Sequence, residues 1–314
     1  MIKVSVIFVN YNGKDLLKAA LESVNKNKDY EIIVVDNNSA DGSVDFVKKN
    51  YKNVKIIENR KNLGYVGINS ALSCCKGKYI LFLNNDIKIE KNCIKELLSV
   101  IEKDDKTGMA APRLVNYYNK NLKSNGTWVS RAFYSGHIGN NAAPEEIPYL
   151  GVGMIKKDII EKFGYIFDPD YFIYAEDVDL GLRLRLLGYK VAFAPKALIY
   201  HLHAATAKKF ASSKTIFLLE RNLLMTFFKI LSLKSILLFL PYVFLIRLLA
   251  IMKDALTLNF RNALSRITAI LWVAFNFSTI YKKRKILQGL RKADDRFILE
   301  VFSEKYLFKK PVLI

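Results

Sequence analysis

Short apolar runs alternate with amphipathic stretches over the first hundred residues. Four apolar runs rich in β-branched residues predict buried strands, at residues 3–9, 31–35, 54–57 and 79–83. Four intervening stretches carry apolar residues at helical spacing and predict helices, at residues 14–27, 43–50, 67–76 and 92–103. Strands that alternate with helices are typical of a mostly parallel sheet with helices on both faces. The sequence therefore predicts the α/β fold class.

A polar cluster follows each of the four predicted strands. The clusters occupy residues 10–13, 36–42, 59–65 and 84–86. In an open parallel sheet, ligands bind beyond the carboxyl ends of the strands. One such cluster alone favours plain turn chemistry, because Asn, Asp and Gly are turn residues. Four clusters at one predicted edge indicate a ligand site.

Residues 116–149 show little periodicity and contain three glycines and two prolines. A loop of this length is usually a lid or a binding segment. Trp128, Tyr134 and His137 within it either face a substrate or hold the loop on the core, and the sequence leaves both interpretations open.

An acidic cluster begins a predicted helix in the second half of the chain. Glu176, Asp177 and Asp179 stand at its start, and Gly188 closes it. Acidic residues in a first helical turn are favoured by the helix dipole, so the cluster has a structural as well as a catalytic interpretation. Glu176 and Asp179 lie one turn apart on the same face, and Asp179 is also placed to orient Arg183.

Charge and apolar residues are unevenly distributed along the chain. The 314 residues carry a formal net charge of +20, and residues 205–314 hold 20 Lys and Arg against 6 Asp and Glu. The same region contains uncharged apolar runs of 12 and 15 residues, at 235–246 and 267–281. These are shorter than the ~20 residues that span a bilayer. Basic residues beside apolar faces suit an anionic membrane surface better than a nucleic acid, so we expect no nucleic-acid partner.

The apolar helices predicted after residue 205 also admit a second interpretation, because helices buried in a soluble core have similar sequences. They would then pack on the N-terminal domain or form a homodimer. The three cysteines cannot build a disulfide framework and indicate a reducing compartment.

Four segments of the N-terminal half together resemble one known family. They read SVIFVNYNGKDLLKAALESV from residue 5, EIIVVDNNSADGS from residue 31, NLGYVGINSAL from residue 62 and LFLNNDI from residue 81. With residues 151–153 and 174–180, they resemble glycosyltransferase family 2, which has the GT-A (Rossmann-like) fold, and within it the rhamnosyltransferase-like branch. The resemblance covers about residues 3–205, and its specificity lies in the combination of motifs. It implies a catalytic domain over residues 1–205. The charge and the apolar runs predict a basic, apolar, membrane-associated helical region over residues 206–314.

The resemblance implies that a nucleotide-diphosphate-sugar donor binds at the strand ends. The residues implied to bind it come from the polar clusters: Asn10, Asp36, Asn62, Gly64, Asn84 and Asn85. Asp36 would accept a hydrogen bond from the pyrimidine ring N–H, or would instead close an Asx turn on Asn38. Gly64 would let the backbone approach the ligand, or would simply form a tight turn.

A divalent metal site is implied as well. Asn84, Asn85 and Asp86 stand where the family carries its DxD motif, so Asp86 would supply the carboxylate for Mg²⁺ or Mn²⁺. His201, about 24 residues after the acidic cluster, would add a ligand, and His203 is the weaker candidate. The structural alternatives are a polar strand end for Asp86 and a buried histidine at a strand end for His201.

The implied catalytic residue is Asp177, which would take the proton of the acceptor hydroxyl in an inverting, one-step displacement. Supporting or acceptor-side roles are expected for Glu176, Asp179, Arg183, Gly153 and Trp128. The acceptor would be a hydroxyl of a lipid-linked or cell-surface glycan, reached by a peripheral or monotopic enzyme on the cytoplasmic face of the cell membrane.

Two other functions are alternatives to this expectation. Transfer to a polyprenyl phosphate needs no base, so the acidic cluster argues against it. A non-catalytic membrane- or sugar-binding protein would have lost Asp86 or Asp177, and the chain has both.

Overall fold

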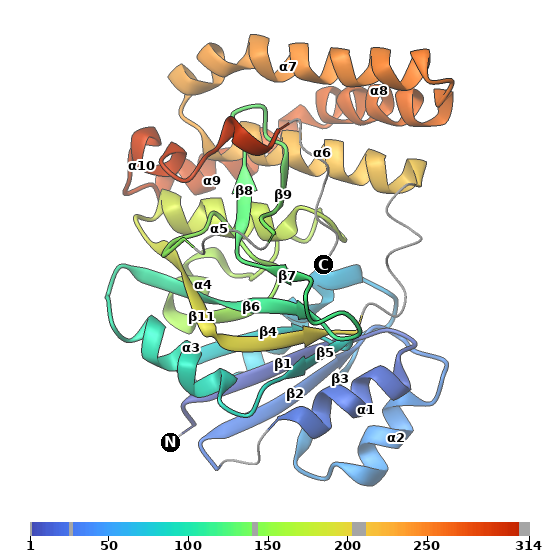
Figure 1. The fold of residues 1–314 in the computed structure, drawn as a ribbon, viewed down its shortest axis with the longest axis vertical. Helices are drawn as coiled ribbons and strands as arrows, with labels where there is room; N and C mark the ends of the chain where they lie inside the picture. The colour runs from blue at the N-terminus through green and yellow to red at the C-terminus, as the bar shows by residue number, and fades with distance from the viewer. Residues whose placement is uncertain (1, 25–27, 140–143, 203–211, 308–314) are drawn as a thin grey trace.

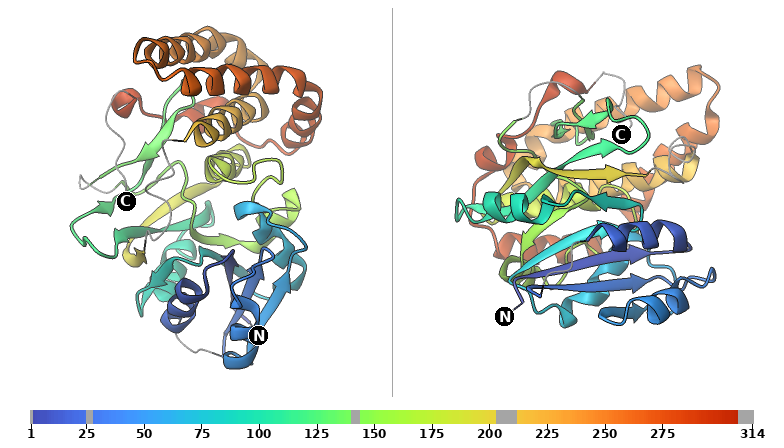
Figure 2. Two further views of the ribbon diagram at one scale, coloured as in Figure 1. Left: turned by 90° about the vertical axis from the view of Figure 1, so that its right-hand side faces the viewer. Right: turned by 60° about the horizontal axis from the view of Figure 1, so that its bottom comes forward.

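The computed structural model describes residues 2–24, 28–139, 144–202 and 212–307. The described chain builds a nine-stranded sheet with helices packed on it. Further helices stack at the end of the molecule away from β1 to β3 (Figures 1 and 2). His203 lies outside the described residues.

The N-terminal half of the sheet is parallel. Its strands, in sheet order, are β3 (Val54–Glu58), β2 (Tyr30–Asp36), β1 (Val4–Asn10) and β4 (Tyr79–Asn84). All seven residues of β1 are buried, because strands pair with β1 on both sides and its apolar side chains enter the core on both faces. The register places Asn10 beside Asp36, and Val9 beside Asn84. The polar strand ends therefore meet at one edge, as the sequence predicts.

Three of the four early helices are confirmed. They are α1 (Lys14–Ser23), α2 (Ser43–Asn50) and α3 (Cys93–Ile101). The helix predicted over residues 67–76 is present as Gly64–Cys74 (η1), but its turns are 3-10 rather than α-helical. Its glycines and serines have weak α-helical preference. Asn69 fixes the segment instead, since its Nδ2 donates to the Phe167 carbonyl at 2.6 Å.

The second half of the sheet is mixed. Strand β10 (Gly153–Lys156) is antiparallel to β4 and to β6 (Thr107–Asn116), and β6 is parallel to β11 (Lys190–His201). Strand β5 (Ile87–Ile89) closes the edge beside β11, where His201 pairs with Ile87. The Leu202 N–H also donates to the Asp86 carbonyl at 2.9 Å. This pairing brings the end of β11 to the polar residues that follow β4.

Residues 116–149 contain more regular structure than the sequence predicts. Three short strands are present: β7 (Lys123–Ser124), β8 (Thr127–Val129) and β9 (Ser135–His137). Strands β8 and β9 form a separate two-stranded sheet. Residues near the end of the described chain hold it in place, since the Ser303 N–H donates to the Val129 carbonyl at 2.8 Å and the Arg131 N–H donates to Glu304 at 2.6 Å.

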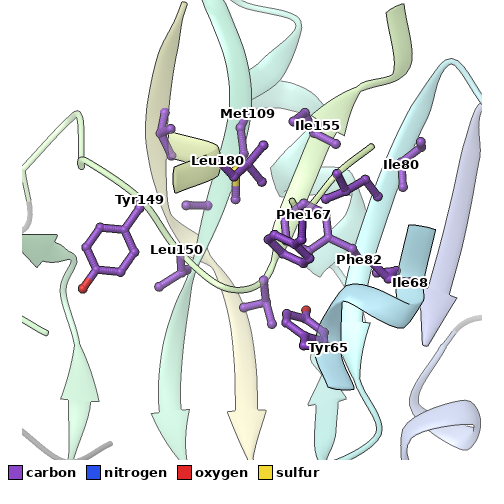
Figure 3. Close-up of a cluster of buried hydrophobic side chains, with 14 of the residues drawn as sticks. Tyr65, Ile68, Ile80, Phe82, Met109, Tyr149, Leu150, Ile155, Phe167 and Leu180 are labelled. Carbon is purple, nitrogen blue, oxygen red and sulfur yellow. The ribbon is translucent and has the colours of Figure 1, made fainter. Parts of the chain in front are cut away.

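An aromatic cluster joins β4, η1 and the segment that leads to α5 (Glu176–Leu186). The Phe167 ring lies 5.5 Å from Phe82 on β4 and 4.8 Å from Tyr65 on η1, measured between centroids (Figure 3). Burying an aromatic side chain of this size contributes about 1.5–3 kcal/mol. The segment before α5 is therefore anchored to the centre of the sheet.

Five α-helices follow β11 in the described part of the chain. They are α6 (Ser213–Ile230), α7 (Leu233–Leu256), α8 (Phe260–Phe275), α9 (Phe277–Gly289) and α10 (Asp295–Leu299). Helix α6 packs on α5, and α7 lies farthest from the sheet, with α8 between α7 and α6 (Figure 1). Leu223, Leu224 and Phe227 of α6 belong to the same core as the sheet.

Buried ion pairs reinforce the contact of α6 with the rest of the fold. Lys229 Nζ lies 2.6 Å from Asp168 Oδ2 and 2.7 Å from Asp179 Oδ1, and all three side chains are fully buried. Removing one partner of such a pair leaves an uncompensated buried charge, which costs several kcal/mol. A domain boundary at residue 205 remains a prediction, and the structure joins α6 closely to both sides of it.

Candidate functional site

A cavity of about 200 Å³ lies at the carboxyl ends of the strands. Among its lining residues are Asn84, Glu176, Asp177 and His201, which come from the end of β4, the start of α5 and the end of β11. Two larger hollows, of about 1080 and 790 Å³, lie at the opposite edge, where strands such as β2 and β4 begin. None of the predicted site residues lines either of them.

Glu176 and Asp177 form an acid pair at the start of α5. Glu176 is only 6% exposed, and its Oε2 has no hydrogen-bond partner among the described residues. Asp177 is partly buried, and its Oδ1 accepts a hydrogen bond from the Val178 N–H at 2.9 Å. Buried polar atoms without partners are uncommon in folded proteins, so the Glu176 carboxyl is poised to meet a ligand.

The surroundings of the acid pair alter its protonation. Burial raises the pKa of Asp177 to about 6. Burial and then the neighbouring Asp177 charge raise the pKa of Glu176 to about 8. At neutral pH the pair therefore presents an ionised Asp177 beside a protonated Glu176, which is the arrangement of a base next to a hydrogen-bond donor.

Asp179 faces away from this cavity, into the protein. Its Oδ2 accepts from Arg183 Nε at 2.6 Å, and Arg183 Nη2 also donates to the Ile166 carbonyl at 2.6 Å. Both side chains are fully buried, and neither lines the cavity. The geometry agrees with the interpretation that Asp179 orients Arg183, and it adds Lys229 as a second partner.

Asp86 and His201 meet as the sequence suggests. His201 Nε2 lies 3.1 Å from Asp86 Oδ2, within hydrogen-bond reach of that carboxylate. Within the described residues, no group of three or more His, Cys, Asp or Glu side chains could hold a metal ion. A carboxylate and an imidazole fit a site that substrate phosphates complete, since Mg²⁺ is commonly held by one or two carboxylates plus such phosphates.

Asn10 and Asp36 lie side by side at the ends of β1 and β2. Asn10 Nδ2 donates to Asp36 Oδ2 at 2.9 Å, and Asn85 Nδ2 donates to Asn10 Oδ1 at 2.8 Å. The Ser39 N–H and hydroxyl donate to the two Asp36 oxygens at 2.8 and 2.7 Å. Asp36 thus closes a turn on Ser39 rather than on Asn38, and its donor-binding role remains a prediction.

Asn62 and Gly64 form the turn that enters η1. Asn62 Oδ1 accepts from the Gly64 N–H at 2.8 Å. Gly64 has a φ of +68°, and a Cβ there would lie 2.2 Å from the Phe172 carbonyl oxygen. Only glycine accommodates both the conformation and this close backbone approach. The turn therefore contacts the segment that leads to the acid pair.

The structure places Gly153 and Trp128 outside the cavity. Gly153 lies within β10, where a Cβ would meet Met109 Cε at 2.5 Å, so its small size serves sheet packing. Trp128 is buried in β8 against Gly136. This position matches the interpretation in which Trp128 holds the loop on the core, whereas His137 from β9 does line the cavity.

Tyr65 and Gly151 line the cavity but were not predicted. Tyr65 lines the cavity, and its hydroxyl donates to the Gly151 carbonyl at 2.6 Å. A Cβ on Gly151 would come within 3.2 Å of Asp177 Oδ2. Gly151 and Tyr65 stand within the recognised motifs, so a local signal existed. Asn222, on α6, lies outside the cavity but donates to the Tyr174 carbonyl just before the acid pair, and no motif in the sequence marks it.

Comparisons with known proteins match mainly the N-terminal part of the chain. The family described as Glycosyl transferase family 2 matches residues 5–164, about half of the chain. The poly(ribitol-phosphate) beta-glucosyltransferase of Bacillus spizizenii is 43% identical over 93 residues, which cover 27% of this chain and 15% of that protein. The low-salt glycan biosynthesis hexosyltransferase Agl10 of Haloferax volcanii is 24% identical over 232 residues, covering 69% of this chain and 73% of that protein.

A solved structure extends the likeness to the fold. The crystal structure of GalNAc-T7 with UDP, GalNAc and Mn²⁺ superposes with a TM-score of 0.58 at 17% sequence identity, covering 72% of this chain and 47% of that chain. At this identity the likeness concerns the fold alone. The chain spans 15% of the length of the Bacillus relative and just under half of GalNAc-T7, so both are larger than the region of similarity.

Proposed function

The chain belongs to glycosyltransferase family 2 and has the GT-A fold, and from that premise we propose that it transfers a sugar from a nucleotide-diphosphate-sugar to a hydroxyl of a glycan acceptor. The observation that carries the proposal is the acid pair, since Glu176 and Asp177 line the same cavity as Asn84 and His201. The cavity lies at the sheet edge where open α/β folds bind ligands.

In the proposed reaction Asp177 is the general base. The acceptor hydroxyl oxygen forms a bond to the anomeric carbon while its proton passes to the Asp177 carboxylate. The bond between that carbon and the diphosphate oxygen breaks, and the diphosphate leaves with the bonding electron pair. This single displacement inverts the configuration at the anomeric carbon. With a pKa of about 6, Asp177 is ionised at neutral pH and still basic enough to receive the proton.

Glu176 has a different part in the proposed reaction. Because its pKa is about 8, it keeps its proton at neutral pH and can donate a hydrogen bond to a sugar oxygen in the cavity. Asp179 and Arg183 support α5 from behind through their buried ion pair.

The metal and the donor are assigned to the strand ends. Asp86 and His201 would hold Mg²⁺ or Mn²⁺, which when bound neutralises the departing diphosphate. The residues proposed to bind the donor are Asn10, Asp36, Asn62, Gly64, Asn84 and Asn85. The contact of Asn10 with both Asp36 and Asn85 supports one continuous donor surface across β1, β2 and β4.

The proposed acceptor is a lipid-linked or cell-surface glycan, and the proposed branch is the rhamnosyltransferase-like one, with a hexose as the sugar. The names of two relatives support the acceptor class, because one acts on poly(ribitol-phosphate) and the other belongs to low-salt glycan biosynthesis. Such acceptors lie at membranes, which directs attention to the C-terminal helices.

The C-terminal helices expose an apolar face. Of the 23 large apolar side chains that are exposed among the described residues, 18 lie between residues 233 and 286. Helix α7, with 24 residues, is long and apolar enough to cross a membrane, and α8 with α9 passes the same test as a pair bent by 66°. Length and composition thus make α7 a candidate span, which the short uncharged runs in the sequence did not predict.

Contacts of α7 favour a position in the membrane surface over a span. Arg247, near the middle of α7, is fully buried, and its Nε lies 3.1 Å from Glu220 Oε2. Arg247 Nη1 also donates to the Ala132 carbonyl at 2.7 Å. One side of α7 is therefore fixed to the fold. We propose that its other side lies with α8 in the cytoplasmic membrane surface, as amphipathic helices do.

A nucleotide-sugar panel tests the proposed activity. Specific donor binding stabilises a fold by mass action, so the correct donor should raise the Tm in the presence of Mg²⁺ or Mn²⁺ and should release its nucleotide slowly by hydrolysis. Absence of any Tm rise and of any nucleotide release across the panel, with either cation, would reject the activity.

Vesicle binding tests the proposed location. Leu245→Glu with Leu248→Glu places two charges on the exposed side of α7, and Tyr118→Glu is the matched control at an exposed site elsewhere. The double variant should lose binding to anionic vesicles, and the control should keep it. We expect partial release of the wild type by high salt and full release in detergent. Protease protection across sealed vesicles would indicate a span, and concentration-dependent dimers without vesicle binding would indicate a homodimer.

A further inference from the structure

The segment that leads into α5 has an uncommon backbone conformation. Phe172, Tyr174 and Ala175 have φ values of 65°, 70° and 59°. This conformation is costly for a non-glycine residue and persists only where neighbouring groups determine it. Ala175 is the N-cap of α5, so this conformation sets the direction in which Glu176 and Asp177 leave the segment.

The side-chain amide of Asn222 on α6 holds this segment. Its Nδ2 donates to the carbonyl oxygens of Tyr171 at 3.2 Å, Ile173 at 3.1 Å and Tyr174 at 2.6 Å. Asn222 is fully buried, and its Oδ1 accepts from Arg221 Nε at 2.8 Å. One amide has only two N–H hydrogens, so the three carbonyl groups that converge on it share them and their orientations are coupled. The Tyr171 carbonyl also accepts from Arg221 Nη2 at 3.1 Å and from the Ile173 N–H at 2.8 Å.

The same segment contacts the proposed donor turn. The Tyr65 N–H donates to the Phe172 carbonyl at 2.8 Å, and this is the oxygen that requires glycine at position 64. Ile173 lines the cavity together with Tyr65. Residues 171–175 therefore connect the donor turn, the acid pair and α6.

We propose that Asn222 is a positioning residue for the transfer reaction: by fixing the carbonyls of Tyr171, Ile173 and Tyr174, it keeps Asp177 directed into the cavity. The proposal rests on the proposed function of Asp177. Asn222 does not line the cavity itself and acts through the segment. It also lies beyond residues 5–164, so the geometry of the acid pair depends on a helix outside the part of the chain that matches the family.

Two substitutions of Asn222 and one matched control test the proposal. Asn222→Ala removes the amide, and Asn222→Ser keeps a single donor and should perturb folding less. Asn276→Ala is the control, because Asn276 Nδ2 donates to the Trp272 carbonyl at 2.8 Å, between α8 and α9 and away from the segment. All four proteins are assayed for hydrolysis of the nucleotide-sugar that the panel identifies.

Asn222→Ala should lower kcat by about tenfold or more, with the donor KM within about threefold, and Asn222→Ser should lie between it and the wild type. The acid limb of the pH–kcat profile should also move to lower pH, because a loosened Asp177 is better hydrated. Asn276→Ala should change none of these. An unchanged kcat and acid limb in folded Asn222→Ser, or an equal loss in Asn276→Ala, overturns the proposal.

Hydrogen exchange separates this proposal from the proposed function. The backbone amides of residues 172–179 should exchange faster in Asn222→Ala and Asn222→Ser than in the wild type. Their exchange rates should be unchanged in Asn276→Ala. Unchanged exchange in both Asn222 variants refutes the positioning contact even if the enzyme is active. If exchange is faster in the Asn222 variants but the wild type neither binds nor hydrolyses any nucleotide-sugar, the proposed function is refuted instead.

Discussion

Asp168 and Asp177 lie at the two ends of one short segment, and their surroundings are opposite. Asp168 is fully buried between Lys229 and Lys283, and although burial alone would raise its pKa, the two ammonium groups hold that pKa well below its usual range. Asp177 lines the cavity and accepts a hydrogen bond from a backbone N–H, that of Val178, and burial raises its pKa to about 6. Burial alone therefore does not decide whether the pKa of a carboxylate rises or falls, because the charge of its partner can outweigh burial.

The two regions respond to pH in opposite directions. Asp168 has a depressed pKa in the folded state, so its stabilising effect is present above its unfolded pKa and is lost as the pH falls. Glu176 and Asp177 have raised pKa values, so they destabilise the fold increasingly as the pH rises from about 4 toward 8. Asp168, paired with two lysines, stabilises the fold, whereas Glu176 and Asp177 in the cavity destabilise it near neutral pH.

The largest expected effect comes from removing the cation that Asp168 and Asp179 share. Lys229→Met leaves two buried carboxylates with less compensation, so the free energy of unfolding should fall by about 3–5 kcal/mol. Urea denaturation measures the change. Lys48→Met is the control, because Lys48 pairs with Glu58 at 2.6 Å on the surface, and it should leave stability nearly unchanged. Equal losses in both variants would abolish the contrast between buried and exposed pairs.

Asp177→Asn should affect chemistry rather than folding. The amide keeps the size of the side chain but accepts no proton, so turnover should fall on the order of 10²-fold or more, while donor binding is roughly kept. The Tm should not fall, since the variant loses a charge that is costly to bury. Nucleotide release and donor titration measure the two effects. Retained turnover, or a larger loss in Glu176→Gln, would assign the base elsewhere.

Asp86→Ala tests whether the carboxylate beside His201 binds a metal, in contrast to Asp168, whose lysine partners make it structural. Metal-dependent donor binding should weaken by about 10–100-fold with the fold intact, because the variant lacks the carboxylate ligand. Isothermal titration with and without Mn²⁺ measures this change. Glu90→Ala, which removes an acid just after β5, is the control. An unchanged affinity and unchanged metal dependence in Asp86→Ala would refute the assignment.

Glu176→Gln should produce the smallest effect, and its sign depends on pH. At pH 8 Glu176 is fully ionised in the unfolded wild type but only about half ionised in the folded one, which favours unfolding, and the variant lacks this penalty. The variant should therefore melt a few degrees higher, about 1 kcal/mol giving 2–4 °C. Near pH 4 the wild-type carboxyl is protonated and the difference should vanish. Thermal melts at pH 4, 6 and 8 measure the trend. A gain that is the same at all three values would mean that charge is not its cause.

The sequence predicted the parts of the site that depend on sheet architecture. Apolar runs located β1 to β4, and their parallel pairing then placed Asn10 beside Asp36. The contact of His201 with Asp86 was expected from the family resemblance, and the pairing of β11 with β5 explains it. These features follow from local periodicity and from one rule about strand ends.

The rest depended on contacts between distant parts of the chain. The sequence indicated Gly153, whereas Gly151 is the glycine that approaches Asp177 in the structure. Strand register decides which of the two glycines lies there. It also took Arg247 as the end of an apolar run, since a charge usually marks an exposed position. Arg247 is instead buried beside Glu220, so α7 continues to Leu256. Neither a register nor a distant counter-ion is visible in a local pattern.

The hydrogen bonds that fasten the small β8–β9 sheet have a consequence for biosynthesis. Arg131 donates to a residue made 173 positions later, and Ser303 joins Val129 across a similar separation. Domains fold largely from the N-terminus as they are made, so the large sheet is complete while these partners are still untranslated. In the growing chain, the polar strand ends therefore form before Ser303 and Glu304 can hold the β8–β9 sheet, which brings His137 to the cavity. Synthesis of the last helices, rather than folding of the sheet, is the event that completes the cavity.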